Sequence, residues 1–162
     1  MALGDALAVA LLDARGFREE DFARSHPGGS LGRKLLMHVV DLMRSGDAVP
    51  RVDAGTVMAN MLHEMTRKGL GFTAVCDAVG KVAGIFTDGD LRRLIETGAD
   101  LRAMRAGEVM SASPKLVHDD ALAVEAAELM ERHRVTGLLV VDRDGRLVGA
   151  INSNDLMRAK VI

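Results

Sequence analysis

The sequence predicts a mixed α/β (α+β) fold in which one β-α-β-β-α unit occurs twice. Gly84–Leu94, which reads as a buried strand, a polar turn and a helix, recurs 65 residues later as Gly149–Arg158. A long repeat without a gap indicates one structural unit present twice. Each unit is too small to bury its own faces, so we expect the two to pack as a pseudo-twofold pair. At the same offset, Met65, Val75, Asp77 and Gly80 recur as Met130, Val140, Asp142 and Gly145.

The first repeat is assigned to residues 38–100. Met58, Met61, Leu62 and Met65 follow the i, i+3, i+4, i+7 spacing of an amphipathic helix that Gly69 ends. The elements expected in order are a short helix Val39–Arg44, an extended piece Val49–Val52, a helix Thr56–Lys68, strands Gly71–Asp77 and Lys81–Phe86, and a helix Asp88–Glu96.

The second repeat is assigned to residues 101–162, and the stretch 98–105 across the boundary is interpreted as the connector between the repeats. The nearly continuous apolar run Leu138–Val141 is typical of a strand covered on both faces. The elements expected are a short helix Ala106–Met110, an edge strand Lys115–His118, a helix Ala121–His133, strands Thr136–Asp142 and Arg146–Ile151, and a last helix Asn154–Lys160.

Composition narrows the function classes. The chain has 162 residues, 48% of them apolar, and a net charge of -2 with no Trp or Tyr, so neither a nucleic-acid surface nor a membrane surface is expected. The single cysteine, Cys76, lies in an apolar strand pattern and indicates a reducing, cytoplasmic compartment. The five histidines show no metal-ligand spacing, and no cofactor or metal is predicted.

The last strand-helix junction of the first repeat carries Gly84, Thr87 and Asp90 as Gly-x-x-Thr-x-x-Asp. With the β-α-β-β-α order, this motif resembles the CBS domain. The resemblance implies tandem CBS repeats that bind adenosine nucleotides or related ligands in the clefts between them.

Thr87 and Asp90 allow two interpretations. A carboxylate can accept hydrogen bonds from ribose hydroxyls, while a threonine hydroxyl and free helix-start amides can hold a phosphate. The same spacing approximates a capping box that only begins a helix. The second repeat has Asn152 and Asp155 at these places, so we rank the Thr87/Asp90 site first.

Three basic side chains flank the expected clefts, namely Lys115, His118 and Arg134. They could neutralise an anionic ligand, or they could simply be solvated surface residues.

Residues 1–37 precede the repeats. Ala2–Arg15 is predicted to be a helix that begins without a capping residue, so we expect the natural chain to start earlier. Ala2–Leu12 and Phe22–Leu36, the latter containing His26-Pro-Gly-Gly, resemble the end of the sugar-isomerase domain of bacterial D-arabinose 5-phosphate isomerases. The resemblance implies that residues 1–37 are the last helix and linker of a sugar-isomerase (SIS) domain otherwise missing here.

This second resemblance implies a parent aldose-ketose isomerase that converts D-ribulose 5-phosphate to D-arabinose 5-phosphate for Kdo and lipopolysaccharide synthesis. It also implies that His26 transfers protons, but only in the full-length parent, where an imidazole suits acid-base work near neutral pH. In this chain we expect His26 to be a loop residue and the chain itself not to be an enzyme.

Three functions follow from these resemblances. The pair is expected to be a regulatory module that binds a nucleotide-sugar such as CMP-Kdo as a feedback effector. Alternatively it senses AMP or ATP. A third possibility is an oligomerisation module without a ligand, because CBS pairs often join into homo-oligomers.

Overall fold

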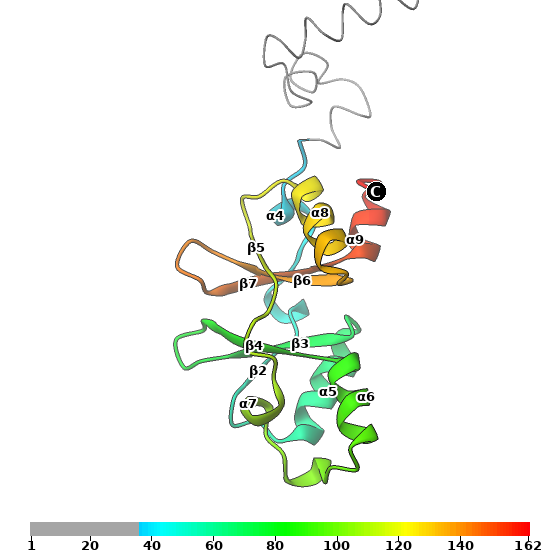
Figure 1. The fold of residues 1–162 in the computed structure, drawn as a ribbon. Helices are drawn as coiled ribbons and strands as arrows, with labels where there is room; N and C mark the ends of the chain where they lie inside the picture. Colours follow the sequence, from blue (N-terminus) through cyan, green and yellow to red (C-terminus); the bar gives the residue numbers. More distant parts are fainter. Residues whose placement is uncertain (1–35) are drawn as a thin grey trace, which may run out of the picture.

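The computed structural model describes residues 36–162 (Figure 1). The helix expected at 2–15, and His26, lie outside the described residues.

Both repeats have the expected β-α-β-β-α order. Helix α6, Asp88–Glu96, has the bounds that the sequence predicts. The first repeat otherwise consists of β2 Arg51–Asp53, α5 Met58–Lys68, β3 Phe72–Cys76 and β4 Val82–Thr87. The second consists of β5 Leu116–His118, α8 Ala123–His133, β6 Gly137–Val141, β7 Leu147–Asn152 and α9 Ser153–Arg158.

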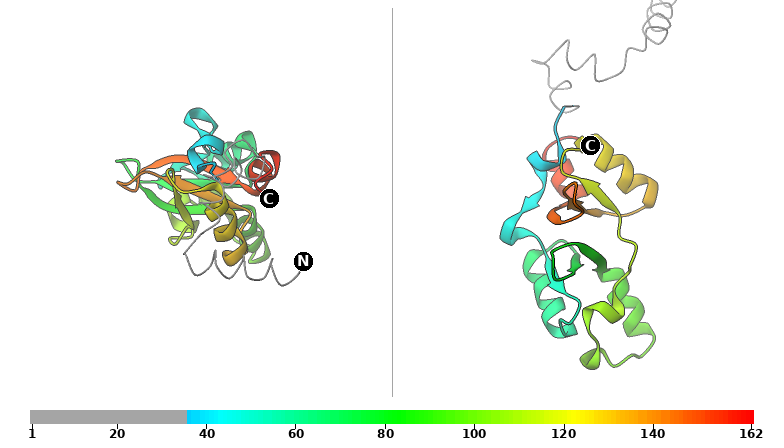
Figure 2. Two further views of the ribbon diagram at one scale, coloured as in Figure 1. Left: turned by 90° about the horizontal axis from the view of Figure 1, so that it is seen from above. Right: turned by 90° about the vertical axis from the view of Figure 1, so that its left-hand side faces the viewer.

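Two sheets face each other across the middle of the molecule, with the helices on the outside (Figures 1 and 2). The first sheet has the order β2-β3-β4, with β2 parallel and β4 antiparallel to β3. The second has the order β1-β7-β6-β5, where β1 is Arg44–Ser45. Apolar side chains of both sheets form a shared core that buries one face of β3, and Val75 on its other face packs in the helix-covered core of the first repeat. Strand β3 is therefore buried along its whole length. The core residues between the sheets are Val49, Leu70, Phe72, Ala74, Cys76, Leu139 and Ala150.

The hairpin turns explain why an aspartate and a glycine recur at the same offset. One oxygen of Asp77 accepts hydrogen bonds from the backbone N–H groups of Val79 and Lys81, at 3.0 and 2.8 Å. Asp142 makes the equivalent pair of bonds in the second repeat. Each turn closes through a glycine in the left-handed region, with φ of +81° at Gly80 and +78° at Gly145. This backbone conformation favours glycine.

Each repeat is preceded by a short helix that packs on the other repeat. Helix α4, Val39–Leu42, places Val39 in the core of the second repeat. Helix α7, Ala106–Val109, places Ala106 in the core of the first. Backbone hydrogen bonds fix both crossings, from Val39 N–H to the Ala121 carbonyl and from Ala106 N–H to the Thr56 carbonyl, each 2.8 Å long. The two repeats are therefore interlocked.

The segment after each short helix runs beside the last strand of the repeat it contacts. Arg44 pairs with Ala150, and Ser111 pairs with Ile85 at the equivalent place. A side chain on Gly84 would come within 2.8 Å of the Ser111 carbonyl oxygen. This close approach accounts for the glycine that begins the Gly-x-x-Thr-x-x-Asp motif.

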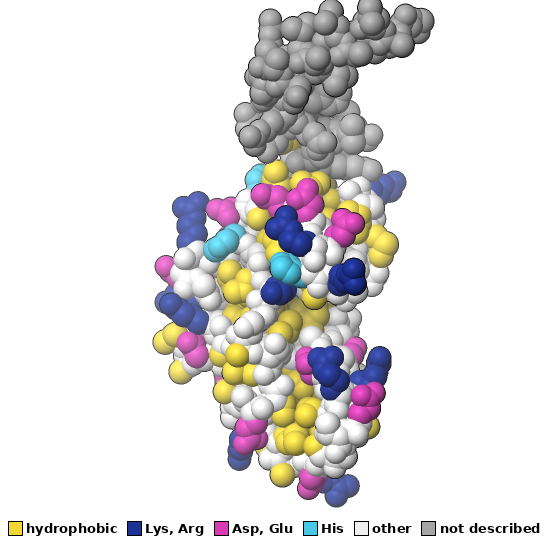
Figure 3. Space-filling view, viewed as in Figure 1, with side chains coloured by type: hydrophobic (Ala, Val, Ile, Leu, Met, Phe, Trp, Pro, Cys, Tyr) yellow, Lys and Arg dark blue, Asp and Glu magenta, His cyan; other side chains and the backbone are white. Residues whose placement is uncertain are grey.

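Charged side chains of both signs are interspersed on the face shown in Figure 3, in keeping with the small net charge. Within residues 36–162, no helix is long and apolar enough to span a membrane.

Candidate functional site

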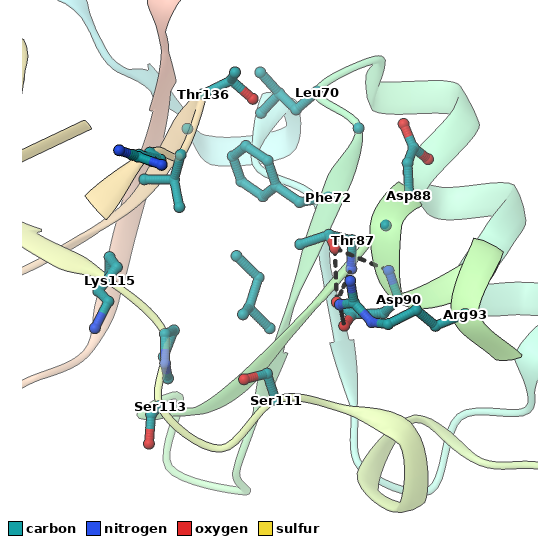
Figure 4. Close-up of a pocket in the computed structure, with 17 residues that line it drawn as sticks. Leu70, Phe72, Thr87, Asp88, Asp90, Arg93, Ser111, Ser113, Lys115 and Thr136 are labelled. Atoms are coloured by element: carbon teal, nitrogen blue, oxygen red, sulfur yellow. Dashed lines mark hydrogen bonds and ion pairs between the residues drawn. The ribbon is translucent and has the colours of Figure 1, made fainter. Parts of the chain in front are cut away.

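A cavity of about 530 Å³ lies between the two repeats (Figure 4). The first repeat contributes the start of α6, and the second contributes the segments before β5 and β6. Four of the residues singled out from the sequence line it together, namely Thr87, Asp90, Lys115 and Arg134. The other lining residues are Leu70, Gly71, Phe72, Ile85, Asp88, Gly89, Arg93, Ser111, Ser113, Pro114, Val135, Thr136 and Gly137.

Thr87 and Asp90 form a capping box at the start of α6. The Thr87 hydroxyl accepts from the Asp90 backbone N–H at 3.2 Å, and Asp90 Oδ2 accepts from the Thr87 backbone N–H at 2.9 Å. The Thr87 hydroxyl also donates to the same Oδ2 at 2.7 Å. The capping interpretation is therefore correct for the local structure, and both side chains still lie on the wall of the cavity.

Asp90 retains capacity for a ligand. Its Oδ2 is saturated by two hydrogen bonds, whereas Oδ1 accepts only from the Arg93 guanidinium among the residues that the structure describes. A carboxylate oxygen can accept two hydrogen bonds, so Oδ1 has one position left. The Arg93 side chain is 69% exposed, and an exposed ion pair of this kind contributes little stability. A ligand hydroxyl can therefore reach Oδ1 beside Arg93 or in its place.

The opposite wall carries positive charge. Lys115 lies across the cavity from Thr87 and Asp90 in Figure 4, and Arg134 lines the same cavity. Within residues 36–162, neither side chain has an ion-pair partner. The apolar part of the lining is Leu70, Phe72, Ile85, Pro114 and Val135. One wall thus accepts hydrogen bonds, the other is cationic, and the apolar residues suit a flat ring.

Arg134 is held in a strained backbone conformation. It ends α8 with φ of +53°, in the left-handed region, where its counterpart Gly69 ends α5 with φ of +66°. A side chain in this conformation costs about 1–2 kcal/mol, and such strain concentrates at functional sites. An arginine at a position suited to glycine is consistent with a role for its side chain in the cavity.

The remaining site residues lie elsewhere. Asn152 and Asp155 form the same capping box at the start of α9, with an Asp155 N–H to Asn152 Oδ1 distance of 3.0 Å. They do not line this cavity. His118 ends β5, where it pairs with Val141, and it is not among the residues that line this cavity, whereas Lys115 just before that strand is.

Sequence reasoning missed Arg93, Ser111, Ser113 and Thr136. The two serines reach the cavity because the segment after α7 crosses to the first repeat, which no local pattern reveals. The spacing of Asp90 and Arg93 was visible, because residues three apart on a helix are neighbours.

Acidic, histidine and cysteine side chains within residues 36–162 form no group of three or more suited to a metal ion.

Two facing β-α-β-β-α repeats with a cavity between them define a tandem-repeat pair. The family model of the CBS domain matches residues 38–97 and 106–162, and the chain belongs to the CBS-domain family.

The chain is also similar along its whole length to arabinose 5-phosphate isomerases KdsD. It is 54% identical over 162 residues to that of Pseudomonas aeruginosa and 49% identical to that of Escherichia coli K12. The match covers 100% of this chain and 50% and 49% of those proteins, so the chain spans about half their length. Among solved structures, CBSX2 in complex with AMP superposes with a TM-score of 0.68 at 26% identity, covering 77% of this chain and 96% of CBSX2.

Proposed function

We propose that residues 38–162 are the regulatory, nucleotide-binding CBS pair of an arabinose 5-phosphate isomerase, and that the cavity at Thr87 and Asp90 holds the effector. The observation that carries this proposal is the arrangement of Asp90 opposite Lys115 across one cavity that Arg134 also lines. The similarity to the KdsD isomerases supports the assignment of the parent.

The cavity suits each part of a nucleotide. Asp90 Oδ1 accepts a hydrogen bond from a ribose hydroxyl, as carboxylates do in many nucleotide sites. Lys115 and Arg134 neutralise a phosphate, to which Ser111 and Ser113 donate further hydrogen bonds. The ring of Phe72 and its aliphatic neighbours offer an apolar surface to the base.

CMP-Kdo is our first candidate for the effector. A KdsD-type parent would convert D-ribulose 5-phosphate to D-arabinose 5-phosphate for Kdo and lipopolysaccharide synthesis in the cytoplasm. CMP-Kdo is the activated sugar of that pathway, and it carries a ribose, a phosphate and a carboxylate that match the acceptor and the cations of the cavity.

An adenine nucleotide is the second candidate, supported by the AMP complex of the similar CBSX2. In either case regulation requires that the effector bind two states of the parent with different affinities. His26 and its acid-base role belong to that parent.

Calorimetric titration of the chain with CMP-Kdo, AMP and ATP tests the proposal. We expect saturable binding of one of them that is weakened at least about tenfold in Asp90→Asn, since the lost contact involves a charged acceptor. Asp144→Asn is the matched control, because Asp144 is exposed in the second hairpin turn, lies outside the cavity and should leave binding unchanged. Absence of binding to a folded sample would refute the nucleotide role. The remaining function would be oligomerisation without a ligand, which the oligomeric state from analytical sedimentation would then test.

A further inference from the structure

The pseudo-twofold relation between the repeats implies a second cleft at Asn152 and Asp155. The segment after each short helix places one residue beside the corresponding cleft, and this residue differs between the two clefts. Ser111 lines the first cleft and pairs with Ile85, whereas Arg44 occupies the equivalent place and pairs with Ala150.

Arg44 bridges the two sides of this second cleft. Its Nη2 lies 3.5 Å from Asp155 Oδ1 at the start of α9, and its Nη1 donates to the Lys68 carbonyl at 3.0 Å, at the end of α5. The corresponding sides of the first cleft are the start of α6 at Asp90 and the end of α8 at His133. A guanidinium therefore spans the space that remains open in the first cleft.

The bridge is also better protected than the corresponding pair in the first cleft. The side chains of Arg44 and Asp155 are 28% and 11% exposed, whereas Arg93, which pairs with Asp90, is 69% exposed. Arg44 further complements the partial negative charge at the end of α5, where the Lys68 carbonyl has no helical partner. Displacing Arg44 would remove the guanidinium donor from Asp155 Oδ1 and from the Lys68 carbonyl, whereas Arg93 can turn into solvent.

We infer that Arg44 is an internal occupant that closes the second cleft, so that each chain binds one nucleotide, in the first cleft. The stoichiometry rests on the proposed function, whereas the occupancy of the cleft by Arg44 does not. The residue that differs between the equivalent positions, arginine in place of serine, is thus the feature that makes the pair functionally asymmetric.

The first arm of the test counts bound nucleotide per chain, using whichever of CMP-Kdo, AMP or ATP binds the unaltered protein. We expect one bound nucleotide per chain for the unaltered protein. We expect two for Arg44→Ser, because this variant places in the second cleft the serine that stands at the equivalent position of the first. Arg102→Ser, at an exposed arginine on the short helical turn Leu101–Ala103, is the matched control and should still bind one. Two sites in the unaltered protein, or one in Arg44→Ser, would overturn the inference.

The second arm needs no nucleotide and so separates this inference from the proposed function. Guanidinium chloride at a few millimolar, with sodium chloride as the ionic-strength control, is added to Arg44→Ser during thermal unfolding. If Arg44 fills the cleft, free guanidinium should bind in its place and raise the Tm by about 1–2 °C, with no rise in the unaltered protein or in Arg102→Ser. The same response in all three proteins, or no rise in Arg44→Ser, would contradict the inference.

Discussion

The ring of Phe72 lies against the backbone of Gly137, the residue that takes its place in the second repeat. Phe72 pairs with Thr87 in one sheet, and Gly137 pairs with Asn152 in the other. Where the two sheets meet, the first repeat thus has a large aromatic side chain, and the second repeat has a glycine that leaves room for it. Both residues also line the cavity, so this contact shapes its floor.

Gly137→Ala should destabilise the protein, because the added methyl group would collide with the Phe72 ring. Overpacking of this kind costs about 1–3 kcal/mol, measurable by urea unfolding. Gly55→Ala is the control, since nothing lies within 4 Å of a side chain at Gly55 and its stability should change little. Adding Phe72→Leu to Gly137→Ala should recover part of the loss; strictly additive effects would contradict the proposed collision.

Thr73→Val should stabilise the protein. Thr73 is 0% exposed, and its hydroxyl has no hydrogen-bond partner within residues 36–162, while the equivalent residue Leu138 packs in an apolar core. Removing a buried unsatisfied hydroxyl should raise the free energy of unfolding by about 1 kcal/mol. Thr66→Val on the exposed side of α5 should give a change within about 0.5 kcal/mol. A loss of stability in Thr73→Val would show that the hydroxyl is satisfied.

Arg134→Gly should make the protein more stable and its binding weaker. Glycine relieves the left-handed conformation, for a gain of about 0.5–1 kcal/mol in unfolding free energy, while loss of the guanidinium weakens a phosphate-bearing ligand roughly tenfold. Lys160→Gly is the matched control, because Lys160 has φ of +57° and lies outside the cavity. Lys160→Gly should gain stability and bind the ligand as tightly as the unaltered protein. Equal ligand affinity in Arg134→Gly and Lys160→Gly would contradict a role for the Arg134 side chain in binding.

The Cys76 thiol should react slowly in the folded protein. Burial raises the pKa of Cys76 above its ordinary value of 9.0, although the nearby Arg51 opposes this. At pH 8, alkylation by iodoacetamide should be at least about tenfold slower in the native protein than in urea, because the thiolate is the reactive form. Equal rates would show an accessible thiol.

The same shift gives a pH dependence of stability. The pKa of Cys76 is raised in the folded state. The stabilising contribution of the neutral thiol to the free energy of unfolding is therefore fully present below the unfolded-state pKa of 9.0, and it is lost as the pH rises through the folded-state pKa. Cys76→Ser should therefore show a smaller alkaline loss of stability, measured from urea midpoints between neutral and high pH.

Local patterns predicted much of this fold, because each reflects a local physical cause. The methionine spacing of α5 predicts one buried helix face, and Met58, Met61 and Met65 are buried in the structure. The recurring Asp-x-x-Gly pattern marks turns that are held by hydrogen bonds between residues two to four positions apart. Thr87 and Asp90 were recognised because their capping contact spans only three residues.

Features that depend on distant contacts were not predicted. The helix expected at Val39–Arg44 ends at Leu42, because Met43 is extended with ψ of 152° and Arg44 pairs with β7. Nothing near Arg44 in the sequence indicates the partners Lys68 and Asp155.

The exchange of α4 and α7 between the repeats has a consequence for the integrity of the molecule. A protease cut in the connector at 98–105 would leave one piece with α4 and the other with α7. Each piece would lack a helix that completes its own core and would carry the helix that completes the other's. The nicked protein should therefore migrate as a single noncovalent complex, and its separated halves should recover structure only when mixed.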